Sequence, residues 1–206
     1  MQNIVVATRN KDKYNEIKEI LKDMPFEVIS MDEAGVDLTA DIEETGKTFE
    51  ENALIKAKKV CELTGEITIA DDSGIEIDYL GGAPGIYSSR FGGKDATDFE
   101  KNKQILEMLE GVPFEKRSAR FTCAIAAAYP DGDHFVVKGS CNGYIGYEPK
   151  GSNGFGYDPI FFVPEYGMTT AQMKPEEKHK ISHRGNALRL MLNEFKKRNA
   201  AQNGKI

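Results

Sequence analysis

Short apolar runs alternate along this chain with stretches in which apolar residues recur every three or four positions. The runs predict strands over residues 3–8, 27–30 and 67–70. Apolar residues at helical spacing predict a helix after Asn10, with Ile17, Ile20 and Leu21 on one face. The same spacing predicts three further helices over residues 48–64, 98–110 and about 182–197. Residues 117–129 and 134–146 predict a long hairpin closed at Asp131–Gly132. Strands interleaved with helices, together with a hairpin, predict an α/β fold with a mixed sheet.

Polar residues mark the ends of two of these elements. Thr48 and Glu51 have the spacing of a capping box at the start of the helix over 48–64, and Gly65 is suited to end it. The strand over 67–70 is followed at once by Asp71, Asp72, Ser73 and Gly74. We therefore expect this polar cluster at the carboxyl edge of a strand, where clefts commonly open.

The composition predicts a single globular domain. The 206 residues, 40% of them hydrophobic, can bury one substantial core. Because no repeat or linker divides the chain, we expect one domain over 1–206, with a frayed tail over about 199–206. The apolar stretch 121–129 is too short to cross a bilayer and the N-terminus lacks an export pattern, so we expect a cytoplasmic protein without a membrane partner. Three scattered cysteines, Cys61, Cys123 and Cys141, predict reduced, mostly buried thiols.

The charge is unevenly distributed. The net charge of −6 disfavours a stable nucleic-acid partner. Residues 31–78 hold fourteen acidic against four basic residues, and residues 174–198 hold eight Lys or Arg against three Glu. Two interpretations follow: two solvated faces of opposite sign, or an acidic metal-binding wall that faces a basic anion-binding wall.

Thr8, Asn10 and Lys13 lie where the first strand passes into a helix. A hydroxyl, an amide, an ammonium group and the free N–H groups of a helix N-terminus could converge there on phosphate. The alternative is that Asn10 caps the helix and Lys13 is solvated.

Four carboxylates, Glu43, Glu44, Asp71 and Asp72, flank the helix that contains Asn52 and Lys56. Gathered at one cleft they would repel one another without a cation, and oxygen ligands favour Mg²⁺, with Mn²⁺ as a substitute. The alternative is a pair of solvated turns.

Residues 151–159, a glycine-flanked aromatic segment, are suited to approach and stack a base. The alternative is a turn whose aromatic side chains complete the core. Lys178, Ser182, His183 and Arg184 then place several donors at the start of the last helix, where basic charge opposes the helix dipole.

Seven short motifs closely resemble those of the inosine/xanthosine triphosphate pyrophosphatases, and the resemblance runs in order from residue 4 to about 192. They are Thr8-x-Asn10-x-x-Lys13, Glu43-Glu44-Thr45-Gly46, Asn52-Ala53-x-x-Lys56-Ala57, Ala70-Asp71-Asp72-Ser73-Gly74, Gly81-Gly82-Ala83-Pro84-Gly85, Gly154-Phe155-Gly156-Tyr157-Asp158-Pro159 and Ser182-His183-Arg184-Gly185. The resemblance implies an elongated mixed sheet with flanking helices that form two lobes around a nucleotide cleft, and a homodimer. It also implies Mg²⁺-dependent hydrolysis of dITP, ITP and XTP to the monophosphate and pyrophosphate, which cleanses the nucleotide pool.

The resemblance also assigns roles. The triphosphate is held by the segment Thr8, Arg9, Asn10, Lys11, Asp12 and Lys13, in which Arg9 replaces the glycine of many members. Glu43 and Asp72 hold the metal, Asp72 accepts the proton, and Ser73 contacts the substrate. The base is placed by Phe155, Gly156, Tyr157 and Asp158, with Lys178, His183 and Arg184 completing its recognition. Accessory residues are Glu44, Lys56, Asp71 and Arg90, and either Asp71 or Glu44 could share the work of the base Asp72.

Two other functions remain open on sequence grounds. One is a pyrophosphatase for other modified nucleotides, such as pyrimidines. The other is a non-catalytic module that binds nucleotides or single-stranded nucleic acid through residues 174–198 and the aromatic residues Phe155 and Tyr157. The acidic residues count against the second function, because they would repel a polyanion that binds without metal.

Overall fold

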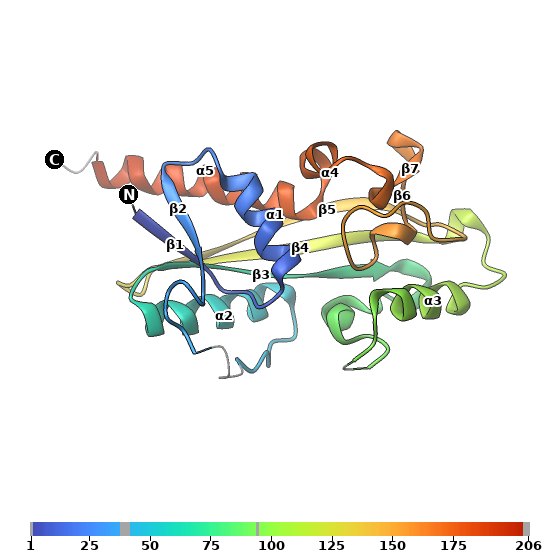
Figure 1. Cartoon of the computed structure of the whole chain (residues 1–206), viewed down its shortest axis with the longest axis horizontal. Coiled ribbons are helices and arrows are strands. Elements are labelled where there is room, and N and C mark those ends of the chain that lie inside the picture. The colour runs from blue at the N-terminus through green and yellow to red at the C-terminus, as the bar shows by residue number, and fades with distance from the viewer. Residues whose placement is uncertain (1, 38–41, 94, 204–206) are drawn as a thin grey trace. The chain divides into compact units, whose positions relative to one another are not determined.

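The computed structural model of the protein describes residues 2–37, 42–93 and 95–203 (Figure 1). The strands are β1 Gln2–Val6, β2 Phe26–Ser30, β3 Ile67–Ile77, β4 Ser118–Ala128, β5 His134–Ile145, β6 Phe161–Val163 and β7 Met168–Thr169. The α-helices are α1 Lys11–Leu21, α2 Phe49–Thr64, α3 Asp98–Met108, α4 Pro175–Ile181 and α5 His183–Asn203, and the short 3-10 helix η2 spans Gly85–Arg90. In these residues no helix is long and apolar enough to cross a membrane.

The strands form one mixed sheet in the order β2-β1-β3-β4-β5-β6-β7. β1 pairs in parallel with β2 and with β3, whereas β6 pairs in antiparallel fashion with β5 and with β7. The predicted α/β fold with a mixed sheet is therefore confirmed, and so is the hairpin, whose turn is closed by the bond from Tyr129 N–H to Asp133 O.

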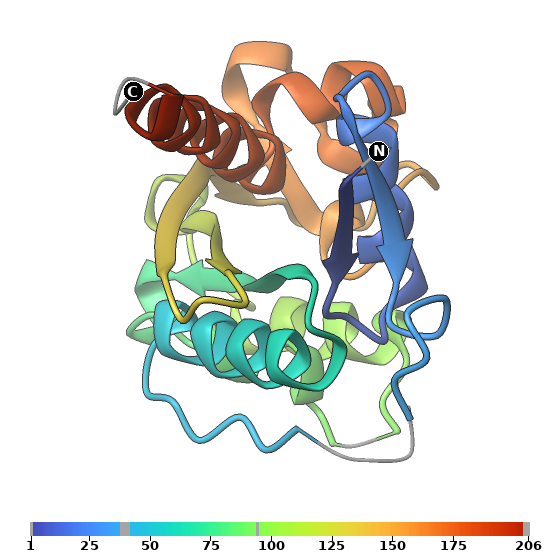
Figure 2. The same cartoon turned by 90° about the vertical axis from the view of Figure 1, so that its left-hand side faces the viewer.

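The chain divides into two compact units, residues 1–72, 123–139 and 184–206 in unit 1, and residues 73–122 and 140–183 in unit 2. In unit 1, α1 and α5 lie on one face of the strands and α2 lies on the other (Figures 1 and 2). Strand alternation produces this arrangement, since Ile4 and Val6 join the cluster with Ile17 of α1 and Leu188 of α5. The prediction of a single domain stays a prediction.

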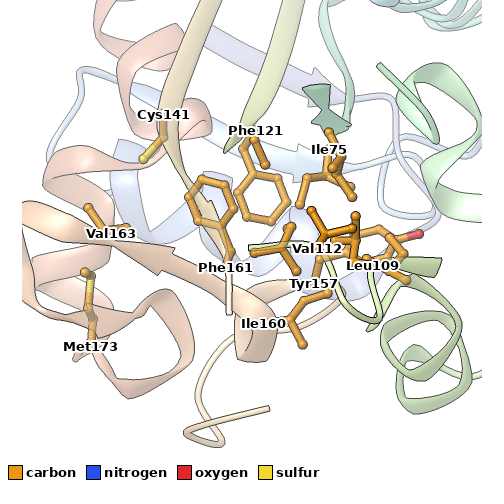
Figure 3. Close-up of a cluster of buried hydrophobic side chains, with 14 residues drawn as sticks. Ile75, Leu109, Val112, Phe121, Cys141, Tyr157, Ile160, Phe161, Val163 and Met173 are labelled. Atoms are coloured by element: carbon orange, nitrogen blue, oxygen red, sulfur yellow. The ribbon is translucent and has the colours of Figure 1, made fainter. Parts of the chain in front are cut away.

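Unit 2 has its own hydrophobic core, which Figure 3 shows in close-up. Phe121 of β4 packs on Phe161 of β6, with ring centroids 4.5 Å apart. Leu109 and Val112, at the end of α3 and just beyond it, belong to the same cluster, as does Tyr157 from the segment before β6. The glycine-flanked segment therefore enters this core through one of its two aromatic residues.

One predicted boundary is wrong, because β3 does not end before Asp71. The strand continues through Asp71, Asp72, Ser73 and Gly74 to Ile77. Its parallel partner β1 stops at Val6, opposite Ile69, but its other neighbour β4 is eleven residues long and supports the extension. The two aspartates thus lie within a strand and just past the end of β1.

The helix ends also differ in detail from the prediction. Thr48 caps α2 by accepting from Glu51 N–H at 3.1 Å, but the Glu51 carboxylate accepts from Lys47 N–H instead of Thr48 N–H, so the capping box is incomplete. Gly65 ends α2 with φ +68°, as predicted. The sequence did not predict α4, and α5 extends to Asn203 instead of ending near residue 197.

Candidate active site

The turn from β1 into α1 is built by its own side chains. Asn10 Oδ1 accepts from the N–H groups of Asp12 (2.9 Å) and Lys13 (3.0 Å), and Thr8 Oγ1 accepts from Asn10 N–H (3.2 Å). Asn10 is therefore the N-cap of α1, while Lys11 and Asp12 are exposed in its first turn. Lys13 is not solvated as the alternative required, because its ammonium pairs with Asp71.

Asp71 lies at the centre of a buried charge network in unit 1. Its Oδ2 accepts from Arg184 Nε at 3.0 Å and from the Cys123 thiol at 2.8 Å, and its Oδ1 pairs with Lys13. The Arg184 guanidinium also pairs with Glu16 through Nη1. Burial raises the pKa of Asp71, but Arg184 and Lys13 outweigh burial and hold that pKa well below its usual range. Asp71 is thus an ionised anchor for two cations.

Asp72, the next residue, has a different environment. Lys56 Nζ lies 3.2 Å from Asp72 Oδ1 and 2.7 Å from Glu44 Oε1, so the ammonium bridges the two carboxylates. Asp72 Oδ2 is buried and has no hydrogen-bond partner among the described residues. Burial raises the pKa of Asp72 above its usual value, although Lys56 and Lys13 oppose the shift. This carboxylate has an uncommitted oxygen that can take a cation, a water or a proton.

The predicted metal ligands Glu43 and Asp72 are not part of a preformed cage. Among the described residues, no group of three or more His, Cys, Asp or Glu side chains is gathered to hold a metal ion. Glu43 is exposed and lines a cavity of about 890 Å³ with Arg9, Lys58 and Lys59. Glu44, by contrast, shares Lys56 with Asp72. Since Mg²⁺ binds through one or two carboxylates and keeps several waters, the orphan oxygen of Asp72 and the nearby Glu44 fit it.

In unit 2, Asp158 fixes the loop that carries Phe155. Its Oδ2 accepts from Phe155 N–H (3.0 Å) and Lys178 Nζ (2.5 Å), and its Oδ1 accepts from Thr170 Oγ1 (2.8 Å). Gly154 has φ +74°, and a Cβ at this position would collide with Asp158 Oδ2. Asp158 and Lys178 are both buried, so the loop is built around an ion pair.

The two aromatic residues of this loop, Phe155 and Tyr157, differ in their exposure. Tyr157 is buried in the core of unit 2 (Figure 3) and donates its hydroxyl to Ser88 O at 2.7 Å, as the core alternative predicted. Phe155 stays partly exposed, with Lys178 Nζ 5.3 Å from its ring centroid. Phe155 is therefore the ring of the pair that stays accessible at the surface of unit 2.

The remaining predicted residues are distributed as follows. His183 is buried and stacks on Phe121, with ring centroids 4.7 Å apart at 14°. Ser73 follows Asp72 in β3 and is partly exposed. Arg90 is exposed at the end of η2, with its guanidinium 5.8 Å from the Tyr87 ring centroid.

Comparison with known proteins places the chain in a family. Residues 4–194 match the model of the Ham1 family. The chain belongs to the Ham1 family. A dITP/XTP pyrophosphatase of Bacillus licheniformis is 49% identical over 189 residues, which are 92% of this chain and 95% of the relative. A dITP/XTP pyrophosphatase of Escherichia coli O157:H7 is 48% identical over 194 residues, 93% of this chain and 97% of the relative.

A solved structure supports the same family at the level of the fold. The HAM1 protein of Coxiella burnetii has a TM-score of 0.85 to this chain at 44% identity, and the match covers 96% of this chain and 100% of that one. The Ham1 match contains both side-chain groups described above, the one around Asp71 and Asp72 and the one around Asp158.

Sequence reasoning missed several partners of these residues. Glu16, Cys123 and Thr170 each contact a predicted site residue, as do Asp98 and Asn102 of α3, which bind the backbone of Gly156. Cys123 lies in an apolar run and the others stand in ordinary helix or turn positions, so no local pattern marks them. Their partners are distant in sequence, as Asp98 and Gly156 illustrate at 58 residues apart.

Proposed function

We propose that this Ham1-family protein hydrolyses non-standard purine nucleoside triphosphates, dITP, ITP and XTP, to the nucleoside monophosphate and pyrophosphate. The observation that carries the proposal is the pair of adjacent aspartates. Asp71 pairs with Lys13 and Arg184, and Asp72 has a buried oxygen without a hydrogen-bond partner among the described residues. The relatives named dITP/XTP pyrophosphatase, aligned over more than nine-tenths of this chain, support the substrate class.

In unit 1, two lysines bind the triphosphate and one carboxylate activates the water. Lys13 and Lys56 neutralise charge that develops on the phosphate oxygens, and Asp71 holds Lys13 in place. Asp72 Oδ2 orients the attacking water and accepts its proton, for which a raised pKa is suited. Asp72 with Glu44 or Glu43 would hold Mg²⁺, which would supply polarisation of the phosphoryl oxygens. The uncommitted Oδ2 supports Asp72 as the base over Asp71.

In unit 2, Phe155 stacks on the base, and Lys178 and His183 supply donors. Hypoxanthine and xanthine carry an acceptor oxygen at C6, where adenine carries an amino group, so adenine would leave a buried donor unpaired. Arg184 is buried between Asp71 and Glu16, which favours a role in ordering Lys13 over direct contact with the base. Asp158 already accepts from Phe155 N–H, Lys178 and Thr170, which favours a role in shaping the loop over contact with the nucleotide.

The test is product analysis with dITP, XTP, dATP, dGTP and dTTP, each with Mg²⁺ and with EDTA. We expect pyrophosphate and the monophosphate from dITP and XTP, in the presence of metal only. Release of orthophosphate, or turnover of modified pyrimidines in preference to dITP, would reject the proposed substrate class. Binding without turnover, retained in EDTA, would favour the nucleotide-binding module.

We also propose, following the family resemblance, that the protein acts as a homodimer in the cytoplasm. Light scattering during size-exclusion chromatography tests the dimer, with twice the chain mass of 22.9 kDa as the expected result. Cell fractionation tests the location.

A further inference from the structure

The loop that carries Phe155 is fastened to α3 through the backbone of Gly156. The Gly156 N–H donates to the Asp98 carboxylate (N···Oδ2 2.7 Å), and the Gly156 carbonyl accepts from the Asn102 side chain (Nδ2···O 3.0 Å). Asp98 and Asn102 are four residues apart on the helix and therefore lie on the same face. Two side chains of one helix thus hold both polar groups of a single residue of the loop.

Asp98 and Asn102 bind the loop at Gly156, which has no side chain that could anchor it. Gly156 has φ +63°, a backbone conformation that other residues rarely adopt. Asp158 accepts from Phe155 N–H and pairs with Lys178, and Tyr157 donates to Ser88 O. Asp98 and Asn102 secure the residue that directly follows Phe155.

Helix α3 is itself held in place. Lys101 Nζ donates to Ser89 O at 2.8 Å, next to the Ser88 carbonyl that accepts from Tyr157. Asn102 is 4% exposed, and its Oδ1 is buried without a hydrogen-bond partner among the described residues. The buried Asn102 side chain is thus directed through its Nδ2 to the Gly156 carbonyl.

We propose that Asp98 and Asn102 are positioning residues for base recognition, which hold the Phe155 loop in the geometry that discriminates among bases. The inference rests on the proposed function, since it takes Phe155 as the stacking ring. A loop that is ordered before binding loses less conformational entropy when the base stacks. A loop without these two hydrogen bonds should bind every purine more weakly. It should also discriminate less between dITP and dGTP.

Three variants of α3 test the proposal by their kinetics. Asp98→Ala removes the acceptor, whereas Asp98→Asn keeps an amide oxygen in its place. Asn102→Leu, of similar shape, removes the donor together with the unsatisfied oxygen. We expect Asp98→Ala and Asn102→Leu to raise KM for dITP about tenfold, with kcat changed less than about twofold, the size of one lost hydrogen bond. We also expect the ratio of kcat/KM for dITP to that for dGTP to fall in Asp98→Ala and in Asn102→Leu, and to stay near the wild-type value in Asp98→Asn.

The control is Lys103→Ala, on the same helix and 64% exposed at its side chain. We expect wild-type kinetics from it. Thermal unfolding of each variant separates positioning from stability, because a loss of selectivity in a variant whose Tm stays close to that of the wild type reflects positioning. If folded Asp98→Ala and Asn102→Leu both keep the wild-type KM and base preference, the proposal is wrong.

A second measurement needs no turnover. The chain contains no tryptophan, so Phe155→Trp places a single tryptophan on the loop, which can be excited selectively over the tyrosines. Time-resolved anisotropy without nucleotide is expected to show a larger fast component when Asp98→Ala is added, and no change when Lys103→Ala is added. Equal anisotropy in all three proteins would overturn the proposal. If wild-type protein hydrolyses no triphosphate, the proposed function fails, and the anisotropy still reports whether α3 holds the loop.

Discussion

Two neighbouring aspartates have opposite environments in this protein. Asp71 accepts from Arg184, Lys13 and Cys123, and these donors hold the pKa of its carboxyl group low in spite of burial. Asp72 pairs with Lys56, its Oδ2 has no hydrogen-bond partner in the part of the chain that the structure describes, and burial raises its pKa. Adjacent carboxyl groups whose environments separate their pKa values are typical of sites where one group binds charge and the other moves a proton.

Replacement of Asp72 by Asn tests this division at the residue scale. Asn has the same shape but cannot accept the proton of the attacking water, so we expect pyrophosphate release from dITP to fall by at least about 10³-fold. The circular dichroism spectrum should match that of the wild type. Glu107→Gln, an exposed acidic residue of α3, is the control and should retain full activity. Substantial activity in Asp72→Asn would move the role of the base to Glu44.

The Asp158–Lys178 pair is the second residue-scale test. Both side chains are buried, so Asp158→Asn and Lys178→Met each leave one uncompensated charge and should lower the free energy of unfolding by about 3–5 kcal/mol. The double variant removes both charges and should recover part of that loss. Urea denaturation of the four proteins measures the coupling. Additive losses would show that the two charges do not stabilise each other.

At the scale of elements, local signals set the helix ends and pairing sets the strands. Asn10, Thr48 and Thr97 cap α1, α2 and α3 from within their own turns. The length of β3 instead depends on β4, since β1 supports it only to Ile69. Caps can therefore be predicted locally, and strand length cannot.

Two glycine-to-alanine substitutions distinguish the cost of a positive φ from the cost of a steric collision in the free energy of unfolding. Gly65 ends α2 with φ +68° and open space around it, so Gly65→Ala should lower the free energy of unfolding by about 1 kcal/mol and leave KM unchanged. Gly154→Ala combines a similar φ with a collision at Asp158 and should cost more stability and raise KM for dITP. Equal losses in urea denaturation for the two variants would contradict this distinction.

At the scale of the whole molecule, the reactivity of the three cysteine thiols measures how well the cores of the two units exclude solvent. Cys61, Cys123 and Cys141 are free and buried, as the sequence predicted. Burial raises the pKa of Cys141 to about 11 and that of Cys123 well above its usual value, so both stay protonated at neutral pH.

We therefore expect native protein to react slowly with Ellman's reagent at pH 8. All three thiols should react at once in 6 M guanidinium chloride, and the native rate should increase as the pH approaches 11. Fast reaction of a full equivalent in native protein would show that at least one unit opens readily.

The chain's own sequence determined which elements form and where most of them begin. Periodicity, caps and turn residues act over a few positions, so the helices after Asn10, Thr48 and Thr97 and the long hairpin could be predicted from local pattern. The roles of Lys13, Asp72, Phe155 and Lys178 stay predictions that rest on the family resemblance. Short β6 and β7 and the brief helix α4 were missed, since a few residues carry too little periodicity.

Only the tertiary structure decided what each site residue contacts. Local pattern does not distinguish Asp71 from Asp72, and their environments differ because Arg184, 113 residues from Asp71 along the chain, pairs with one of them. Tyr157 and Phe155 differ in the same way, one buried in the core and the other left accessible. The physical reason is that burial and ion pairing depend on residues brought together by folding, which sequence spacing does not encode.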